Sequence, residues 1–296
     1  MNLQTLLGDT PHQQFVAEHY QRLPFSRPGG AKPLCQLASW ETLVEIVTRP
    51  DADVLVVRRG QQYDGPPPRS VAEAQQLCDE GYTFRIRHAE RQHAGLGKLA
   101  AAFARDFAAT VDIHMYCTPA EQFGFGWHYD AEEVFILQTT GRKEYSLRKN
   151  TVNPWPVEET LPADMRYERE IMPVMKCLLS GGDWIYIPSG YWHMGQASET
   201  SISLSIGVMP TTGIDASNFL RTKVLDSLLW RQRLPTLGEA SNLSAEEQQA
   251  AYRQLFSDLA ADLTKTLANE RMLTQFMRQV RSRAPSDSSN ERNGHA

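Results

Sequence analysis

The sequence is poor in cysteine and contains no long run of apolar residues. Its four cysteines are scattered and show no CxxC spacing: Cys35, Cys78, Cys117 and Cys177. We therefore expect neither a disulfide framework nor a thiolate zinc site. No stretch approaches the roughly 18 apolar residues that a membrane-spanning helix needs, and the N-terminus lacks the basic start and apolar core of a signal peptide. These absences predict a cytoplasmic protein without a membrane segment.

An excess of positive charge is also missing. The formal net charge is -5, so the chain has no overall field that attracts phosphate groups. The composition therefore carries no strong nucleic-acid signature, although a local basic patch is compatible with it. The same acidic balance favours a basic protein partner through long-range attraction.

The length allows one large domain and a smaller second unit. With 296 residues and 41% hydrophobic content, the chain can bury one sizeable core. We expect residues 1–33 to be a helical lead-in, with a helix around 15–22 followed by a turn-rich surface stretch. Residues 34–210 should form the main domain and residues 211–283 a helical region. Residues 284–296 are polar and predict a disordered tail.

Short apolar segments punctuated by glycine and proline dominate residues 111–209. They predict short strands at 111–116, around 127–130, and at 134–138, 143–147, 176–179, 184–188 and 201–208. Strands 134–138 and 143–147 should form a hairpin through the turn 139–142. Residues 54–58 predict a further strand, and residues 95–107 an amphipathic helix. The expected fold is mainly β with flanking helices, a jelly-roll or cupin-like barrel whose mouth commonly holds a ligand.

Helical periodicity returns after Pro210. Asp215 is the predicted N-cap of a first helix, and Ser244 with Glu247 has the spacing of a capping box for a second. Between Tyr252 and Leu267 large apolar residues recur at steps of three and four, which predicts an apolar stripe. Either a second copy of the chain covers this stripe or the helices pack back on their own barrel. We expect the first arrangement, a two-fold homodimer.

Two residues around the predicted strand at 127–130 can ligate a metal. On an extended chain His128 and Asp130 point to the same face. His193 follows the apolar strand that ends at Pro188. Two histidines and one carboxylate leave three positions of an octahedral metal open, as in non-haem Fe(II) oxygenases, whereas zinc enzymes with such ligands hold a four-coordinate metal. An H-x-D triplet alone is weak evidence, because a surface histidine and a turn aspartate often occur this close together.

Lys143 strengthens the metal interpretation. It shares a strand face with Tyr145 and Leu147, so a barrel interior on that face would hold a lysine ammonium. A buried ammonium needs an anion near it. A dicarboxylate that chelates the metal at one end would present its far carboxylate as that anion. The alternative is a solvated lysine on an exposed hairpin.

These residues together resemble a known family. WHYD at 127–130 with Lys143 downstream, GGDWIYIPSGYWH at 181–193 and SISLSIGV at 201–208 resemble the JmjC or cupin-like 2-oxoglutarate oxygenases, especially the ribosomal oxygenases. The likeness extends more weakly over residues 12–283. It implies a double-stranded β-helix, Fe(II) bound by His128, Asp130 and His193, and Lys143 paired with the C5 carboxylate of 2-oxoglutarate. It also implies hydroxylation coupled to decarboxylation of that cosubstrate, and a C-terminal dimerisation region.

Two features depart from the family. Several relatives have a Ser or Thr three residues before the first iron histidine, where it helps to hold the C5 carboxylate, and this chain has Phe125. Tyr116 and Ser203 are the candidates that could replace that hydroxyl. The larger ribosomal oxygenases also end in a winged-helix domain, whereas only a short polar stretch follows Arg283 here. Substrate recognition that depends on such a domain therefore cannot be assumed.

Three functions remain open at this level. The first is a hydroxylase of a protein side chain, with a ribosomal protein as one substrate class. The second is the same oxygenase chemistry on a small molecule, a peptide natural product or a modified nucleoside. The third is a cupin-like module that binds a ligand without turnover. We expect the first, and we interpret Tyr129, Trp192 and His114 as mainly structural, although each could contact the site.

Overall fold

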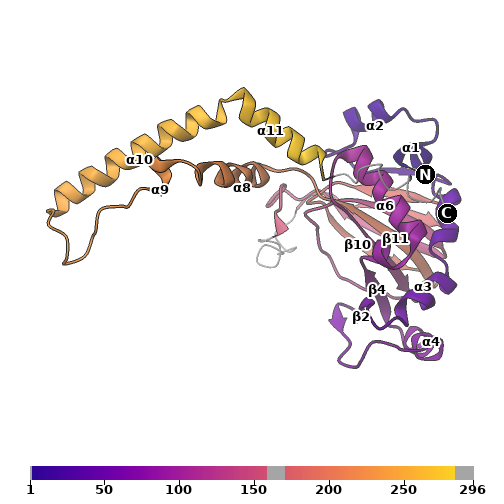
Figure 1. Ribbon diagram of the computed structural model, residues 1–296. Coiled ribbons are helices and arrows are strands. Elements are labelled where there is room, and N and C mark those ends of the chain that lie inside the picture. Colours follow the sequence, from indigo (N-terminus) through magenta and orange to yellow (C-terminus); the bar gives the residue numbers. More distant parts are fainter. Residues whose placement is uncertain (1, 159–170, 284–296) are drawn as a thin grey trace, which may run out of the picture. The chain divides into compact units, whose positions relative to one another are not determined.

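The computed structural model describes residues 2–158 and 171–283. It divides into two compact units, one that ends at Pro210 and one that comprises Thr211–Arg283 (Figure 1). The predicted disordered tail, residues 284–296, lies outside the described residues.

Two antiparallel sheets form the centre of the first unit. The larger has eight strands in the order β1-β9-β6-β11-β5-β4-β2-β3, and the smaller has the order β10-β7-β8. The larger sheet comprises β1 (Phe25–Arg27), β2 (Asp53–Arg58), β3 (Gln61–Gln62), β4 (Thr83–Arg87), β5 (Val111–Thr118), β6 (Glu133–Thr140), β9 (Trp184–Ile187) and β11 (Ser201–Val208). The smaller comprises β7 (Arg142–Arg148), β8 (Met175–Ser180) and β10 (Trp192–Ala197).

The period of two along each strand gives the larger sheet two different faces. On β11, Ile202, Leu204 and Ile206 are buried in the main hydrophobic core, whereas Ser203 and Ser205 between them line a cavity on the other face. On that cavity face, apolar residues of β6 and β9 pack with Tyr145, Leu147 and Leu179 of the smaller sheet. The two sheets therefore face each other, and the prediction of a jelly-roll or cupin-like fold is confirmed.

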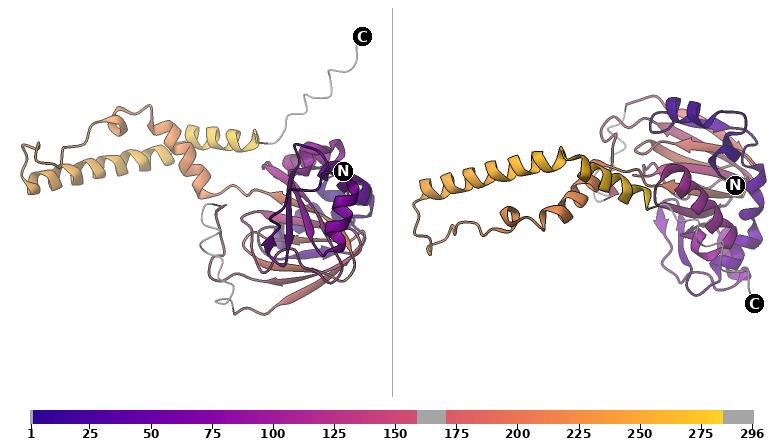
Figure 2. Two further views of the ribbon diagram at one scale, coloured as in Figure 1. Left: turned by 90° about the horizontal axis from the view of Figure 1, so that it is seen from below. Right: turned by 45° about the horizontal axis from the view of Figure 1, so that its top comes forward.

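Helices cover the outer face of the larger sheet (Figure 2). They are α1 (Leu3–Leu7), α2 (His12–Glu18), the 3-10 helix η1 (Lys32–Leu37), α3 (Trp40–Val47), α4 (Val71–Asp79), α5 (Ala89–Gln92) and α6 (Ala94–Phe107). The predicted amphipathic helix is α6, and Leu96, Leu99 and Phe103 form its buried side. Phe103 packs edge-on against Phe135 of β6, with ring centroids 5.2 Å apart. These helices cover one face of the larger sheet, and the cavity lies on its other face.

The predicted hairpin between residues 134–138 and 143–147 is wrong. Both segments are strands, but β6 pairs with β9 and β11, whereas β7 pairs with β8 and β10. Only Gly141 separates them, and a two-residue loop is the usual minimum for a hairpin. Gly141 has a φ of 67°. The chain therefore turns a corner there and passes from one sheet to the other, which carries Lys143 to the side opposite β5.

The N-terminal segment also differs from its prediction. The helix expected around residues 15–22 begins earlier, at His12, and ends at Glu18 before Gln21, whose φ is 61°. The turn-rich stretch that follows is not all surface. Phe25–Arg27 pairs with β9 as an edge strand, and Ala31 is fully buried.

The second unit consists of α8 (Gly213–Val224), α9 (Leu228–Arg231), α10 (Ala245–Leu267) and α11 (Glu270–Arg281). The capping box of Ser244 with Glu247 at the start of α10 is confirmed. The predicted cap of α8 is wrong by three positions. Thr212 is the N-cap, and Asp215 is its capping-box partner, whose carboxylate accepts the Thr212 N–H at 2.8 Å. Within the described ranges, none of the helices is both long and apolar enough to cross a bilayer.

Candidate metal and dicarboxylate site

A single backbone bridge brings the distant histidines together. His128 donates its N–H to the His193 carbonyl at 3.1 Å, and His193 donates to the His128 carbonyl at 2.7 Å. His193 lies on β10, but the segment around His128 is a loop with this one bridge and not the strand that the sequence predicted. The Gly190 N–H bonds to the Asp130 carbonyl at 2.9 Å, so the two loops are joined a second time.

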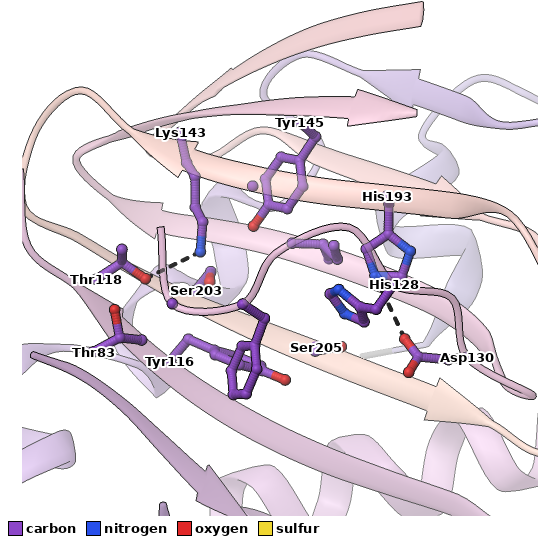
Figure 3. Close-up of a pocket in the computed structure, with 14 residues that line it drawn as sticks. Thr83, Tyr116, Thr118, His128, Asp130, Lys143, Tyr145, His193, Ser203 and Ser205 are labelled. Carbon is purple, nitrogen blue, oxygen red and sulfur yellow. Dashed lines mark hydrogen bonds and ion pairs between the residues drawn. The ribbon is translucent and has the colours of Figure 1, made fainter. Parts of the chain in front are cut away.

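The side chains of His128, Asp130 and His193 converge on one point. Their candidate ligand atoms all lie within 4.8 Å of one another. His193 Nε2 is 3.5 Å from Asp130 Oδ2, and the two imidazole centroids are 4.2 Å apart (Figure 3). The structure thus places the three predicted ligands as a triad beside the cavity between the sheets.

Hydrogen bonds set the tautomers of both histidines. His128 Nδ1 is 2.8 Å from the Gly126 carbonyl oxygen, and His193 Nδ1 is 3.0 Å from the Tyr191 carbonyl oxygen. A carbonyl oxygen only accepts, so each Nδ1 must carry the hydrogen. In the neutral form of such an imidazole, Nε2 keeps the lone pair that a metal-ligating histidine needs.

The electrostatics of the triad also suit a metal. Burial, together with the charge of His128, lowers the pKa of His193 to about 4, so the imidazole is neutral at physiological pH. Burial alone would raise the pKa of Asp130, but the neighbouring imidazoles and the Arg85 guanidinium outweigh it and hold the pKa below its usual range. Neutral imidazoles and an ionised carboxylate are the protonation states in which these side chains bind metal.

Lys143 lies in the same cavity, away from the triad. Its side chain is buried, and Nζ donates to the Thr118 hydroxyl at 3.1 Å (Figure 3). The rings of Tyr116 and Tyr145 flank the ammonium, with centroids 5.7 Å and 5.6 Å from Nζ. Within residues 2–158 and 171–283 the ammonium has no carboxylate within 4.0 Å. Burial lowers the pKa of Lys143 to about 8, and an anion in the cavity would stabilise its charged form.

The two hydroxyls predicted beside Lys143 lie in the cavity, but neither bonds to the lysine. Tyr116 and Ser203 both line it, and Ser203 is a hydrogen-bond partner of Tyr145. The hydroxyl that contacts Lys143 belongs to Thr118, which the sequence reasoning did not single out. Thr118 lies two residues after Tyr116 on β5, so strand alternation places both on the same face.

Tyr129, Trp192 and His114, which the sequence analysis interpreted as mainly structural, are buried and contact other side chains or the backbone. Tyr129 and Trp192 are buried and pack edge to face, with centroids 4.7 Å apart. His114 is buried, and its Nδ1 accepts the His88 N–H at 3.4 Å. Burial lowers the pKa of His114 to about 3, so it carries no charge.

A second group of candidate ligand residues has internal partners. His88, Glu90 and Asp112 also bring their ligand atoms within 4.8 Å of one another. The Glu90 carboxylate, however, accepts the Ile113 N–H at 2.9 Å and lies 3.3 Å from the Arg91 guanidinium. These contacts already occupy the Glu90 carboxylate, which makes it less available to a cation than the carboxylate of the triad.

Known proteins share sequence similarity and a fold with this chain. Residues 91–215 match the family model described as a JmjC domain. This part of the chain is similar to a JmjC domain, and the chain is also similar to proteins named ribosomal oxygenases.

The curated relatives are much longer proteins. The bifunctional lysine-specific demethylase and histidyl-hydroxylase NO66 of Dictyostelium discoideum is 32% identical over 133 residues, which are 44% of this chain and 25% of that protein. Human ribosomal oxygenase 1 is 28% identical over 145 residues, which are 48% of this chain and 22% of that protein. The matches thus span about a quarter of these relatives' length.

Solved structures with the same fold cover more of the chain. The crystal structure of E. coli YcfD superposes with a TM-score of 0.61 at 19% identity, over 91% of this chain and 71% of that one. YcfD solved in complex with cobalt and 2-oxoglutarate gives a TM-score of 0.58 at 19% identity, over 93% of this chain and 72% of that one. These likenesses show that the fold is shared.

The geometry of the triad predicts where divalent metal binds. His128→Ala and Asp130→Ala should each weaken Mn(II) or Fe(II) binding by at least about a hundredfold, because even the loss of a residue that only orients a ligand commonly costs 10- to 100-fold. Calorimetric titration with Mn(II) measures the affinity. His88→Ala, in the second cluster, should leave it unchanged. Retention of metal by both triad variants, with loss in His88→Ala, would place the site elsewhere.

Proposed function

We propose that the chain is an Fe(II)- and 2-oxoglutarate-dependent hydroxylase, with iron bound by His128, Asp130 and His193. The observation that carries this proposal is the pairing of two features in one cavity. The triad lines the cavity and would give a metal three ligands, and the cavity's far end holds a buried lysine without a described carboxylate partner.

The cavity residues have distinct tasks in such a reaction. With dioxygen as the oxidant, bound iron and 2-oxoglutarate would supply the oxidising chemistry: one oxygen atom would enter succinate as carbon dioxide is lost, and the other would hydroxylate a C–H bond. The Nδ1 hydrogen bonds to Gly126 and Tyr191 keep both imidazoles oriented with Nε2 toward the metal. Lys143 would pair with the far carboxylate of the cosubstrate and fix the position of the cosubstrate in the cavity. The rings of Tyr116 and Tyr145 flank the Lys143 ammonium at this end of the cavity.

Relatives support this combination of ligands. YcfD, which shares the fold, has been solved with cobalt and 2-oxoglutarate and also with cobalt and succinic acid. NO66 proteins are named histidyl-hydroxylases, and the human relative is named a ribosomal oxygenase.

We extend the proposal to a protein substrate, specifically a side chain of a ribosomal protein. The relatives' names point to this class. The net charge of -5 favours a basic partner, and ribosomal proteins are basic. Such a substrate would place the reaction in the cytoplasm.

Lys143 gives the sharpest test of the cosubstrate. Lys143→Ala should raise the dissociation constant for 2-oxoglutarate at least about tenfold, since breaking a buried charge pair costs about 2 to 5 kcal/mol. Calorimetry on the Mn(II)-loaded protein measures this constant, and Mn(II) affinity should stay normal. An unchanged constant would remove Lys143 from the site.

The pH dependence of the same binding follows from the pKa of Lys143, which is about 8 in the free protein. The carboxylate binds the protonated lysine, so affinity should be level below that pH and fall as the lysine deprotonates above it. The expected slope is about tenfold per pH unit. Lys143→Ala should abolish this slope. A slope that persists in the variant would assign the titration to another group.

The substrate proposal predicts a mass change in a ribosomal protein. The iron-loaded enzyme with 2-oxoglutarate should add one oxygen atom to one ribosomal protein purified from a strain that lacks the gene. Fragmentation mass spectrometry locates the oxygen, and Asp130→Ala serves as the inactive control. If no protein gains oxygen but a small metabolite stimulates succinate release, the substrate is a small molecule.

We further propose that the second unit forms a symmetric homodimer. Large apolar side chains on its helices are exposed in the single chain, including Phe256 and Leu267 of α10 and Leu273 and Met277 of α11. An isologous helical bundle would cover them, as two-fold dimers commonly do.

The dimer can be tested by mass in solution. Light scattering at micromolar concentration should give twice the chain mass of 33.4 kDa. Leu273→Glu with Met277→Glu should shift the protein to the monomer, because charges would be buried in the interface. Leu178→Glu, at an equally exposed apolar residue of β8, should not shift it. A mass near that of one chain in the unsubstituted protein would refute the dimer.

A further inference from the structure

Thr83 lies outside the strands that carry the triad, yet it faces the cavity. It begins β4, which extends the larger sheet beyond β5. The register pairs Phe84 with Cys117 and Arg85 with Tyr116. One step further, the same register sets Thr83 opposite Thr118, the residue that bonds to Lys143. Thr83 lines the same cavity as Thr118 and Lys143.

The hydroxyl of Thr83 has no partner in the part of the chain that the structure describes. Its side chain is 1% exposed, and Oγ1 is a buried oxygen without a hydrogen bond. Buried hydroxyl groups in folded proteins almost always find a partner. Since this one faces a cavity and not packed side chains, a ligand can supply the partner.

Packing holds this hydroxyl in place. Gly124 lies against the Thr83 side chain so closely that an added Cβ would come within 2.7 Å of Thr83 Cγ2. The methyl group is therefore wedged against the loop that leads to His128. Figure 3 shows the hydroxyl directed toward the end of the cavity where Thr118 and Lys143 lie.

We propose that Thr83 is a positioning residue for the far carboxylate of 2-oxoglutarate, to which it donates a hydrogen bond beside Lys143 and Thr118. This inference rests on the proposed function. A carboxylate accepts about four hydrogen bonds, so one ammonium leaves acceptor positions open. The chain has Phe125 where several relatives have a hydroxyl residue, and Thr83 would supply the missing donor from a different strand.

The test compares two chelating ligands, of which only one has the far carboxylate. Both 2-oxoglutarate and oxalate can chelate a metal through adjacent oxygens, but oxalate has no far carboxylate. In calorimetry on the Mn(II)-loaded protein, Thr83→Val should weaken 2-oxoglutarate about tenfold, which corresponds to about 1.4 kcal/mol. Oxalate binding should be unchanged. Thr83→Ser, which restores the hydroxyl, should bind 2-oxoglutarate within about twofold of the unsubstituted protein.

A matched control separates the hydroxyl from general packing. Thr42→Val changes another buried threonine, in α3, and should affect neither ligand. Equal 2-oxoglutarate affinity in Thr83→Val and the unsubstituted protein would overturn the inference, as would an equal loss of both ligands. If the unsubstituted Mn(II)-loaded protein bound oxalate but not 2-oxoglutarate, the proposed function itself would fail.

Discussion

The pair of backbone hydrogen bonds between His128 and His193 is the constraint on which the site depends. The segment around His128 forms no longer strand pairing, so these two bonds and the neighbouring bond from Gly190 to the Asp130 carbonyl fix its position. The bridge brings the two imidazole centroids to 4.2 Å, with the ring planes tilted by 54°, and Asp130 lies beside them. Gly126 and Tyr191, each two residues before a histidine, then accept from the Nδ1 atoms. The bridge thus sets the position of the ligands, and the carbonyl groups beside it set the tautomer of the two histidines.

Most of the other residues that line the cavity come from strands, along which side chains point alternately to one face of the sheet and to the other. The same strands that bury apolar residues under the helices turn their polar residues toward the smaller sheet, so the core and the site are two faces of one layer. This arrangement lets a lysine be buried opposite β5, where its hydroxyl partner comes from Thr118. Burying the Lys143 ammonium without a counter-charge lowers the stability of the folded protein. An anion bound in the cavity would offset this cost. Metal ligands at one end and a cation at the other favour an elongated anion with two binding ends.

The sequence was sufficient to predict three candidate ligand residues whose side chains converge in the structure, but not how the chain brings them together. His128 and Asp130 were found from their spacing, and the shared face needed only local geometry. The hairpin across Gly141 was wrong because a local turn pattern does not reveal to which sheet the next strand belongs. Thr118 and Thr83 were missed because threonines on strands are common, and only the register between β4 and β5 sets these two beside Lys143.

The most direct test of the account is uncoupled turnover of the cosubstrate. The protein loaded with Fe(II) and given oxygen and 2-oxoglutarate alone should release succinate and carbon dioxide slowly and in equal amounts, and Zn(II) in place of Fe(II) should stop this release. That result would show that metal and dicarboxylate meet in one reactive site. If the protein binds both Fe(II) and 2-oxoglutarate but releases no succinate, with or without ribosomal proteins, the cavity is a binding site and the assignment as an oxygenase is contradicted.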